Sequence, residues 1–210
     1  MKKTVHFVTC LLLLTFPVFA ADFRAAIAVG IVTPDPLLPI SGGVGPSRPV
    51  SSKEGDLTVR AMVLEQGGTR VAFVSSDFLG FPAALGNKVR AKVTGIPAEN
   101  ILIGATHTHS APDCYGFPDG RGGFASDLKY LDFVCNKMAE AINSAVSNLQ
   151  PASLKIATGQ AKGKIAYNYY APQLYDPRCS VIQAVGAIFF HAVVKRPNMP
   201  LIQKAQHRLF

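Results

Sequence analysis

The chain has 210 residues, of which 49% are hydrophobic, and a formal net charge of +8. This length is sufficient for one domain with a sizeable apolar core. The charge does not indicate a nucleic-acid-binding protein, because residues 21–194 carry 15 basic and 13 acidic side chains and show no basic stripe with interleaved aromatic residues. We therefore expect no nucleic-acid partner. Four cations in residues 195–210 would allow a peripheral membrane contact through anionic lipid head groups, although such charges more often form a solvated surface.

The first twenty residues predict a signal peptide. A basic start at Lys2 and Lys3 precedes a largely apolar run over residues 8–16 and a small-residue cleavage site at residues 18–20. The apolar run is short for a membrane span, and an uncleaved anchor is the alternative interpretation. We expect an exported protein, periplasmic or secreted, whose fold excludes residues 1–20. Three cysteines remain after residue 20, so at least one has no disulfide partner within the chain.

The first part of the mature chain predicts strands separated by a long loop. Residues 25–32 form the first expected strand. Residues 33–56 contain five prolines and four glycines, which is typical of a loop. Residues 57–65 and 70–76 are typical of a hairpin. The second strand of this hairpin is apolar on both faces, so we expect it to be central in its sheet.

A helix and a further strand follow. Pro82 is well placed to begin a helix, and Gly95 to end it. Its expected inner face consists of Leu85, Val89 and Val93. Residues 101–105 are then typical of a buried strand. This order of strand, helix and strand predicts a right-handed crossover and a parallel pair of strands.

The second half predicts one long helix and several strands. Residues 127–149 carry apolar side chains at intervals of three and four, the pattern of a helix with one buried face. Strands are expected over 154–158, 165–170 and 181–190, with a turn over 159–164. The predicted fold class is α/β, with a mixed, mostly parallel β-sheet flanked by helices and incomplete at its C-terminus.

Two histidines follow the strand at 101–105. His107 and His109 are separated by one residue, which on a strand places both side chains on the same face. Pro112 ends regular pairing shortly afterwards. Neutral imidazole is the commonest nitrogen ligand of zinc. A bare pair of this kind also occurs as two histidines that bond only to loop backbone, so the pattern alone leaves both interpretations open.

The flanking residues favour the metal site. The sequence Thr-His-Thr-His-Ser-Ala-Pro at 106–112 resembles the zinc-site motif of the neutral/alkaline non-lysosomal ceramidases, in which a glycine stands in place of Ala111. Further segments are similar to the same family in order and spacing. These segments are Thr33-Pro34 with Gly42-Gly43, residues 59–64 and 67–77, residues 95–100, residues 148–152 and residues 189–202.

This resemblance implies that residues 21–202 are the N-terminal part of a ceramidase-like catalytic domain and that residues 203–210 are a tail without family character. The implied function is that of a zinc-dependent amide hydrolase. Its substrate would be a lipid-like N-acyl amide, an N-acyl sphingoid lipid such as ceramide, cleaved to a fatty acid and a sphingoid base. The implied cofactor is Zn²⁺, with His107 and His191 as metal ligands and His109 as the catalytic residue that contacts the substrate or the transition state.

Several departures from the family keep alternatives open. Ala192 follows His191 where the family usually has proline, and His191 can equally be a lone histidine at a strand end. The family's glutamate and tyrosine zinc ligands, and its reactive serine, lie beyond the point where this chain stops. The alternative is therefore a catalytically inactive truncated fragment, or an export-targeted binding domain. A different metal hydrolase, such as a phosphoesterase, would need further Asp or His ligands that are not found.

Other residues have less specific expected roles. Asp77 follows a buried strand and would either orient an imidazole or serve as a helix N-cap or turn aspartate. Tyr169 replaces the arginine of a family Asn-Arg pair that begins at Asn168, and it cannot supply a cationic fork. Cys114 lies within reach of the histidine motif and Cys135 on the long helix. The remaining candidates, Asp113, Tyr115 and Asp119, are expected at the rim of the site.

Overall fold

The computed structural model describes residues 23–43, 45–163, 168–172, 174 and 176–186, together with the backbone of 190–195. Its main element is a seven-stranded sheet with the order β5-β4-β3-β1-β7-β8-β9. The strands are β1 (Arg24–Ile31), β3 (Thr58–Gln66), β4 (Thr69–Ser76), β5 (Ile101–Ala105), β7 (Gln150–Gln160), β8 (Arg178–Gly186) and β9 (Phe190–Lys195). A small two-stranded sheet joins β2 (Ile40–Ser41) to β6 (Ala111–Pro112). The helices are α1 (Ala83–Arg90), α2 (Leu128–Ser147) and the short 3-10 helix η1 (Ala98–Asn100).

The mixed α/β class is confirmed, but the expectation of a mostly parallel sheet is wrong. The parallel pair in the main sheet is β4 with β5, as the strand–helix–strand order predicts. The other five pairings are antiparallel. A parallel neighbour requires a long crossover, which here is supplied by α1, whereas β3 and β4 are joined by a tight turn. Gly67 and Gly68 in that turn have φ values of +57° and +80°, which glycine adopts without a steric penalty.

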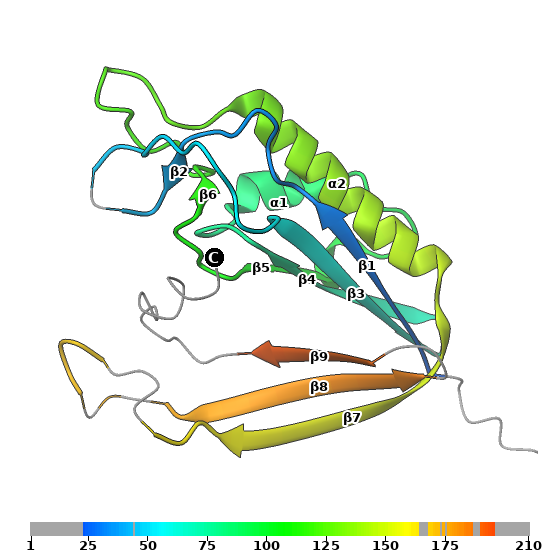
Figure 1. Cartoon of the computed structure of the whole chain (residues 1–210). Helices are drawn as coiled ribbons and strands as arrows, with labels where there is room; N and C mark the ends of the chain where they lie inside the picture. The colour runs from blue at the N-terminus through cyan, green and yellow to red at the C-terminus, as the bar shows by residue number, and fades with distance from the viewer. Residues whose placement is uncertain are drawn as a thin grey trace, which may run out of the picture.

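The two helices cover one face of the strands β1, β3 and β4 (Figure 1), and the main apolar core lies between them. The helix α2 contacts β1, β3 and α1. Val134, Met138 and Ile142 on its inner face are each fully buried, so the spacing of apolar residues in the sequence predicts this face correctly. Asp127 caps the helix by accepting a hydrogen bond from the Tyr130 N–H. Pro82 begins α1 as expected, but the helix ends at Arg90, and Val93 packs on the core from the turn that follows.

The opposite face of these strands is covered by the sheet itself. The main sheet curls so that β7, β8 and β9 lie beneath the other strands (Figure 1). A second apolar cluster fills the space between the layers and includes Met62 and Leu64 of β3 and Ala184 of β8. This arrangement depends on a short pairing in which Arg24 and Ala25 of β1 face Pro151 and Gln150 of β7.

The later elements differ in extent from the expectations. The strand expected at 154–158 is longer, because β7 already begins at Gln150. The segment expected as one strand over 181–190 is divided between β8, which ends at Gly186, and β9, which begins at Phe190. Of the strand expected at 165–170, residues 165–167 lie outside the described residues. Asn168 instead forms a turn, in which its side-chain oxygen accepts hydrogen bonds from the Tyr170 and Ala171 N–H groups.

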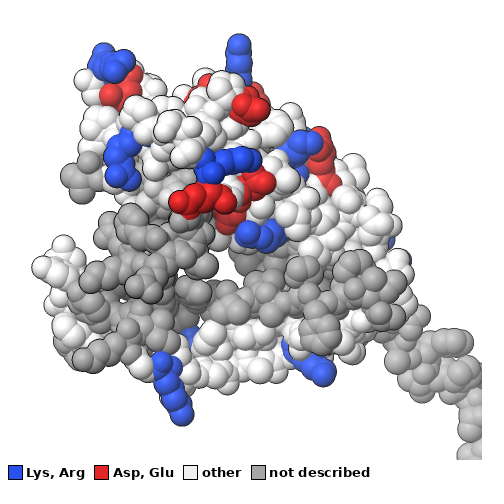
Figure 2. Space-filling view, in the orientation of Figure 1, with Lys and Arg blue, Asp and Glu red and all other residues white. Residues whose placement is uncertain are grey.

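Two further observations concern the surface and the chain ends. On the face shown in Figure 2, basic and acidic side chains are interspersed. Within the described part of the chain, no helix is both long and apolar enough to cross a membrane. The predicted signal peptide at 1–20 and the tail at 203–210 lie outside the described residues and stay predictions.

Candidate functional site

The candidate site is formed by the segments that leave the carboxyl ends of β4 and β5. These strands are parallel, and their last residues, Ser76 and Ala105, face each other. The Thr106 N–H donates to the Ser76 carbonyl oxygen over 2.9 Å, which extends the pairing by one residue. The fully buried Ser76 hydroxyl donates to the Gly104 carbonyl oxygen over 3.0 Å. Because the carboxyl ends of parallel strands meet at one edge, the following segments, 77–81 and 106–112, lie close together there.

His107 is held in a backbone conformation that is unusual for its residue type. Its φ is +62°, in the left-handed region, where a non-glycine residue persists only if its surroundings impose it. The Nδ1 atom lies 2.6 Å from the carbonyl oxygen of Leu79. A carbonyl oxygen can only accept, so Nδ1 carries a proton, and in the neutral imidazole Nε2 keeps a free lone pair. Histidines that bind a metal through Nε2 typically donate the proton of Nδ1 to a backbone carbonyl or a carboxylate in this way.

His109 lies directly beside His107. The ring centroids are 5.2 Å apart, and the planes meet at 70°. The Nε2 atom of His109 is buried and has no hydrogen-bond partner among the described residues. A buried polar atom without a partner costs about 1–3 kcal/mol. A buried nitrogen without a partner is therefore typical of a binding site in which a ligand supplies the missing hydrogen bond.

The glycine loop after β2 forms one wall against His109. Ser41 and Ile40 pair with Ala111 and Pro112, which fixes this loop to the histidine segment. Gly42 has a φ of +105°, and a Cβ placed there would lie 2.9 Å from Cγ of His109. Only glycine therefore allows the backbone to approach the imidazole this closely.

The electrostatic surroundings favour a neutral His109. Burial lowers the pKa of this imidazole below its ordinary value of 6.5, and the nearby His107 and Arg48 lower it further. Arg48 is held near the glycine loop by two backbone hydrogen bonds with Ile40, of 2.9 and 2.8 Å. At neutral pH, His109 therefore has one nitrogen that can accept a proton or a hydrogen bond.

The two histidines are adjacent, but not for the reason that their spacing suggests. β5 ends at Ala105, so residues 107–109 are not part of a strand. The left-handed turn at His107 breaks the alternation of faces, and the imidazoles are brought together by this turn and by the Leu79 carbonyl. The expectation of two side chains on one strand face is therefore wrong, although the predicted proximity is confirmed.

Cys114 supports the segment that orients His107. Its sulfur donates to the carbonyl oxygen of Gly80 over 2.9 Å, one residue after Leu79. Burial raises the pKa of this thiol to about 11, so Cys114 is a protonated hydrogen-bond donor at neutral pH. Tyr115 packs over the same segment, since a Cβ at Gly80 would meet its hydroxyl group. Cys135 is fully buried on α2, as expected for an apolar core residue.

Asp77 does not orient an imidazole in this structure. Its carboxylate accepts hydrogen bonds from the backbone N–H and the hydroxyl group of Thr58 and forms an ion pair with Arg60. Neither expected role of this aspartate is therefore observed, because its carboxylate joins the end of β4 to the neighbouring strand β3. The group that does orient His107 is the main-chain carbonyl of Leu79, which sequence analysis missed because every residue carries such a carbonyl.

The third histidine of the predicted site, His191, lies on β9, where its backbone faces Ala184 of β8. Its side chain lies outside the described residues, so its predicted role as a ligand stays a prediction. Among the side chains that the structure describes, no group of three or more His, Cys, Asp or Glu residues could hold a metal ion. The described part of the site therefore supplies two imidazoles.

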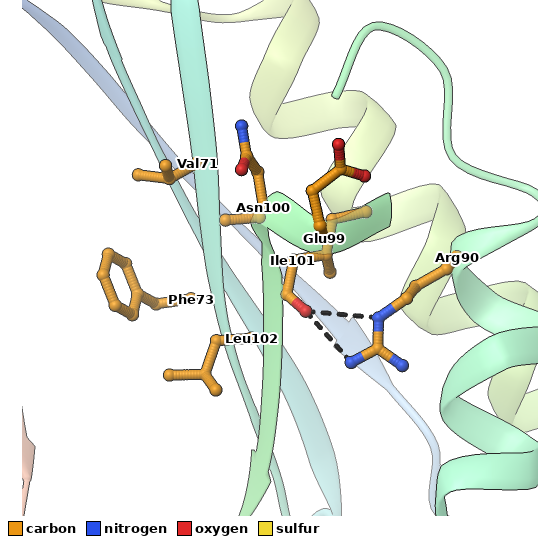
Figure 3. A pocket seen from close by; sticks show the side chains of 8 residues that line it. Val71, Phe73, Arg90, Glu99, Asn100, Ile101 and Leu102 are labelled. Carbon is orange, nitrogen blue, oxygen red and sulfur yellow. Dashed lines mark hydrogen bonds between the residues drawn. The ribbon is translucent and has the colours of Figure 1, made fainter. Parts of the chain in front are cut away.

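A shallow pocket of about 400 Å³ lies at the other end of β5 (Figure 3). Its lining residues are Val71, Ala72, Phe73, Arg90, Glu99, Asn100, Ile101 and Leu102. The Arg90 guanidinium donates two hydrogen bonds to the Ile101 carbonyl oxygen, of 3.2 and 3.0 Å, which caps the start of the strand. The histidines follow the opposite end of β5, so this pocket is separate from the candidate site.

Comparisons with known proteins identify the fold. No family model matches the chain, and no curated protein matches it. Among solved structures, a ceramidase complexed with C2 superposes with a TM-score of 0.66 at 22% sequence identity, over 85% of this chain and 31% of that chain. The neutral ceramidase of Pseudomonas aeruginosa gives a TM-score of 0.64 at 21% identity, over 85% of this chain and 32% of that chain. The chain therefore has a partial ceramidase-like fold, as the sequence resemblance predicts, and it spans about a third of the length of these neighbours.

Proposed function

We propose that this chain carries the two-histidine part of a zinc-dependent amide hydrolase site that acts on N-acyl lipids, with ceramide-like N-acyl sphingoid lipids as the substrate class. The observation that carries the proposal is the pair formed by His107, whose Nδ1 is bonded to the Leu79 carbonyl, and His109, whose buried Nε2 has no partner among the described side chains. The likeness to two ceramidase structures supports the same reaction class.

The residues fit a zinc ion through the chemistry of their donor atoms. His107 would bind it through Nε2, because its Nδ1 proton is donated to Leu79. His191 on β9 would be the second nitrogen ligand, as the sequence resemblance implies. When bound, zinc would polarise the amide carbonyl and make a bound water more acidic.

The other residues would position the substrate and handle protons. His109 lies beside His107 at the wall formed by Gly42. From there its imidazole would hydrogen-bond the amide oxygen or move a proton toward the leaving amine, which are roles worth roughly 100- to 1,000-fold in rate. The absence of a Cβ at Gly42 allows the backbone to lie against this imidazole.

The hydrolysis of a fluorescent N-acyl sphingosine tests this proposal. We expect fatty acid release by the zinc-loaded chain and a reduction of kcat of roughly 100-fold in His109→Ala. His207→Ala, which changes a histidine outside the motif, is the matched control and should keep the full rate. A zinc-loaded chain that binds the lipid but releases no fatty acid would instead identify a non-catalytic lipid-binding domain.

We also propose that the protein is exported, on the basis of the basic start, apolar run and cleavage site in residues 1–20. Sequencing the N-terminus of the mature protein tests this proposal. We expect a start at Ala21, and a start at Met1 would contradict it.

A further inference from the structure

The stretch of chain between β4 and α1 carries the carbonyl group that orients His107. Its start is fixed, because the Asp77 N–H donates to a carbonyl oxygen of β3 over 3.0 Å. At its other end, the Pro82 carbonyl oxygen accepts the first hydrogen bond of α1. Between these two residues, the backbone groups bond to no other backbone group among the described residues. The direction of the Leu79 carbonyl is therefore not set by a strand or a helix.

Side chains from the segment that follows β5 bond to this stretch instead. Two successive carbonyl oxygens each accept one hydrogen bond. The Leu79 oxygen accepts from Nδ1 of His107 over 2.6 Å, and the Gly80 oxygen accepts from Sγ of Cys114 over 2.9 Å. A carbonyl oxygen can only accept, so the thiol is the donor in the second contact. The two donors therefore hold neighbouring peptide groups of the same stretch.

The second contact matters for the first because it acts on a glycine. Glycine has the greatest backbone freedom of all residues, so the peptide groups on either side of Gly80 rotate readily unless they are held. The Leu79 carbonyl belongs to the peptide group before Gly80, and the bonded Gly80 carbonyl belongs to the one after it. Tyr115 packs closely here, since its hydroxyl oxygen lies 1.7 Å from the position of a Cβ at Gly80. A donor on the Gly80 carbonyl therefore restricts the orientation of the Leu79 carbonyl.

The backbone that carries Cys114 is itself held in place. The preceding strand β6 pairs with β2. Asp113 is 2% exposed, and its carboxylate accepts hydrogen bonds from the N–H groups of Tyr115 and Gly116. The Cys114 side chain is buried in the main core, with 5% of the residue exposed. The thiol can therefore restrain the Leu79–Gly80 stretch, because its own position is fixed by other contacts.

We propose that Cys114 is a positioning residue of the histidine site. Its thiol, through the Gly80 carbonyl, keeps the Leu79 carbonyl directed at His107. This carbonyl keeps the imidazole proton on Nδ1 and leaves Nε2 free. Without the thiol donor, the Leu79 carbonyl rotates away and the proton is shared between the two ring nitrogens. The consequence for metal binding rests on the proposed function, whereas the effect on the tautomer of His107 does not.

Long-range proton–nitrogen NMR spectra of the full chain test this proposal, because each tautomer of an imidazole has its own pair of nitrogen shifts. The spectra are recorded at pH 8 in EDTA, so that a failure of zinc binding does not affect the result, and His107→Ala assigns the signals. We expect the proton on Nδ1 of His107 in the wild type. Cys114→Val fills the same space without a donor and should give nitrogen shifts averaged between the tautomers. Cys114→Ser retains a donor and should restore the wild-type shifts.

Cys135→Val is the matched control. The Cys135 thiol is also fully buried and donates to a backbone carbonyl, that of Leu85 over 3.8 Å, but it lies on α2. Its replacement should lower the stability of the chain without changing the nitrogen shifts of His107. This comparison separates the positioning of His107 from a general loss of stability. If circular dichroism shows that Cys114→Val does not fold, Cys114→Ala is measured in its place.

The zinc affinity of the same variants, measured by competition with a chelating dye, connects this role to the proposed function. Cys114→Val should bind zinc about tenfold more weakly than the wild type, and Cys114→Ser about as tightly. Unchanged shifts of His107 in Cys114→Val, or an equal change in Cys135→Val, would overturn the proposal. So would a wild-type chain with the proton on Nε2 of His107. A wild-type chain that binds no zinc, but whose His107 tautomer depends on Cys114, would support the positioning role and contradict the proposed function.

Discussion

The Nδ1 atom of His107 lies 2.6 Å from the carbonyl oxygen of Leu79 and donates its proton to it. This contact joins the two segments that follow the parallel strands β4 and β5 and decides which nitrogen of His107 remains free. The same contact holds the histidine in a left-handed conformation with φ of +62°. Backbone strain is therefore present at His107, the residue that the sequence motif assigns to the metal. Strained residues of this kind are often found at functional sites.

The left-handed conformation predicts an unusual order of stability among variants of His107. His107→Gly should be more stable than His107→Ala by about 1 kcal/mol, because glycine adopts a positive φ without a steric penalty. Urea unfolding of both variants measures this difference. At Thr106, which has no positive φ, the order should be reversed, with the alanine variant the more stable. If the alanine variant were the more stable at both positions, the left-handed conformation of His107 would be contradicted.

The contact between Gly42 and His109 predicts a large effect of adding one methyl group. Gly42→Ala places a Cβ 2.9 Å from the imidazole, in addition to the strain of its φ of +105°. Gly45→Ala has a similar φ of +96° but no atom within 4 Å, so it isolates the backbone effect. We expect Gly42→Ala to be less stable than Gly45→Ala by about 1–3 kcal/mol in urea unfolding. Equal stability of the two variants would show that the imidazole lies elsewhere.

The burial of Cys114 predicts a slow reaction with alkylating agents. Its pKa of about 11 leaves almost no thiolate at pH 8, whereas Cys179 is partly exposed. Peptide mapping after a short treatment with iodoacetamide should find Cys179 labelled and Cys114 unmodified. Labelling of both cysteines at one rate would contradict the hydrogen-bonded, buried position of Cys114 beside Gly80.

The ion pairs of Glu65 predict that the free energy of unfolding decreases as the pH becomes acidic. The hydrogen bond from Arg70, together with that from Arg24, holds the pKa of this carboxylate below the ordinary value of 4.5. The unfolded chain therefore binds a proton at higher pH than the folded chain. The stability from these pairs is fully present above pH 4.5 and is lost as the pH falls through the lower folded value.

Glu65→Gln should accordingly show a shallower loss of unfolding free energy over this acidic range than the wild-type chain. Urea unfolding at a series of pH values measures the slope. Glu140→Gln, which removes an exposed ion pair with Lys137, is the control and should leave the slope nearly unchanged. A slope that is identical in Glu65→Gln and wild type would contradict the prediction.

The parts of the fold that depend on local pattern are predictable from the sequence. The apolar spacing that includes Val134, Met138 and Ile142 predicts the buried face of α2, and the turn at Gly67-Gly68 predicts the hairpin of β3 and β4. The position of β1 between β3 and β7 is not predictable in this way. It is set by pairing between residues far apart in the chain, such as Arg24 with Pro151, which leaves no periodic signal.

The candidate site shows the same division. The sequence motif identifies His107 and His109, because histidines at this spacing are chemically distinctive. The sequence does not reveal the left-handed turn at His107, since histidine has no strong preference for it, nor the wall formed by Gly42. These features depend on backbone contacts between segments that are distant in the chain.

The zinc content of the purified full chain tests the central claim most directly. We expect about one zinc per chain for the wild type and for the control variant His207→Ala, as is usual for a catalytic zinc site. The variant that combines His107→Ala with His191→Ala should contain none, while its circular dichroism spectrum stays that of the folded chain. A wild-type chain without zinc, or a double variant that retains it, would contradict the proposal that these histidines form a metal site.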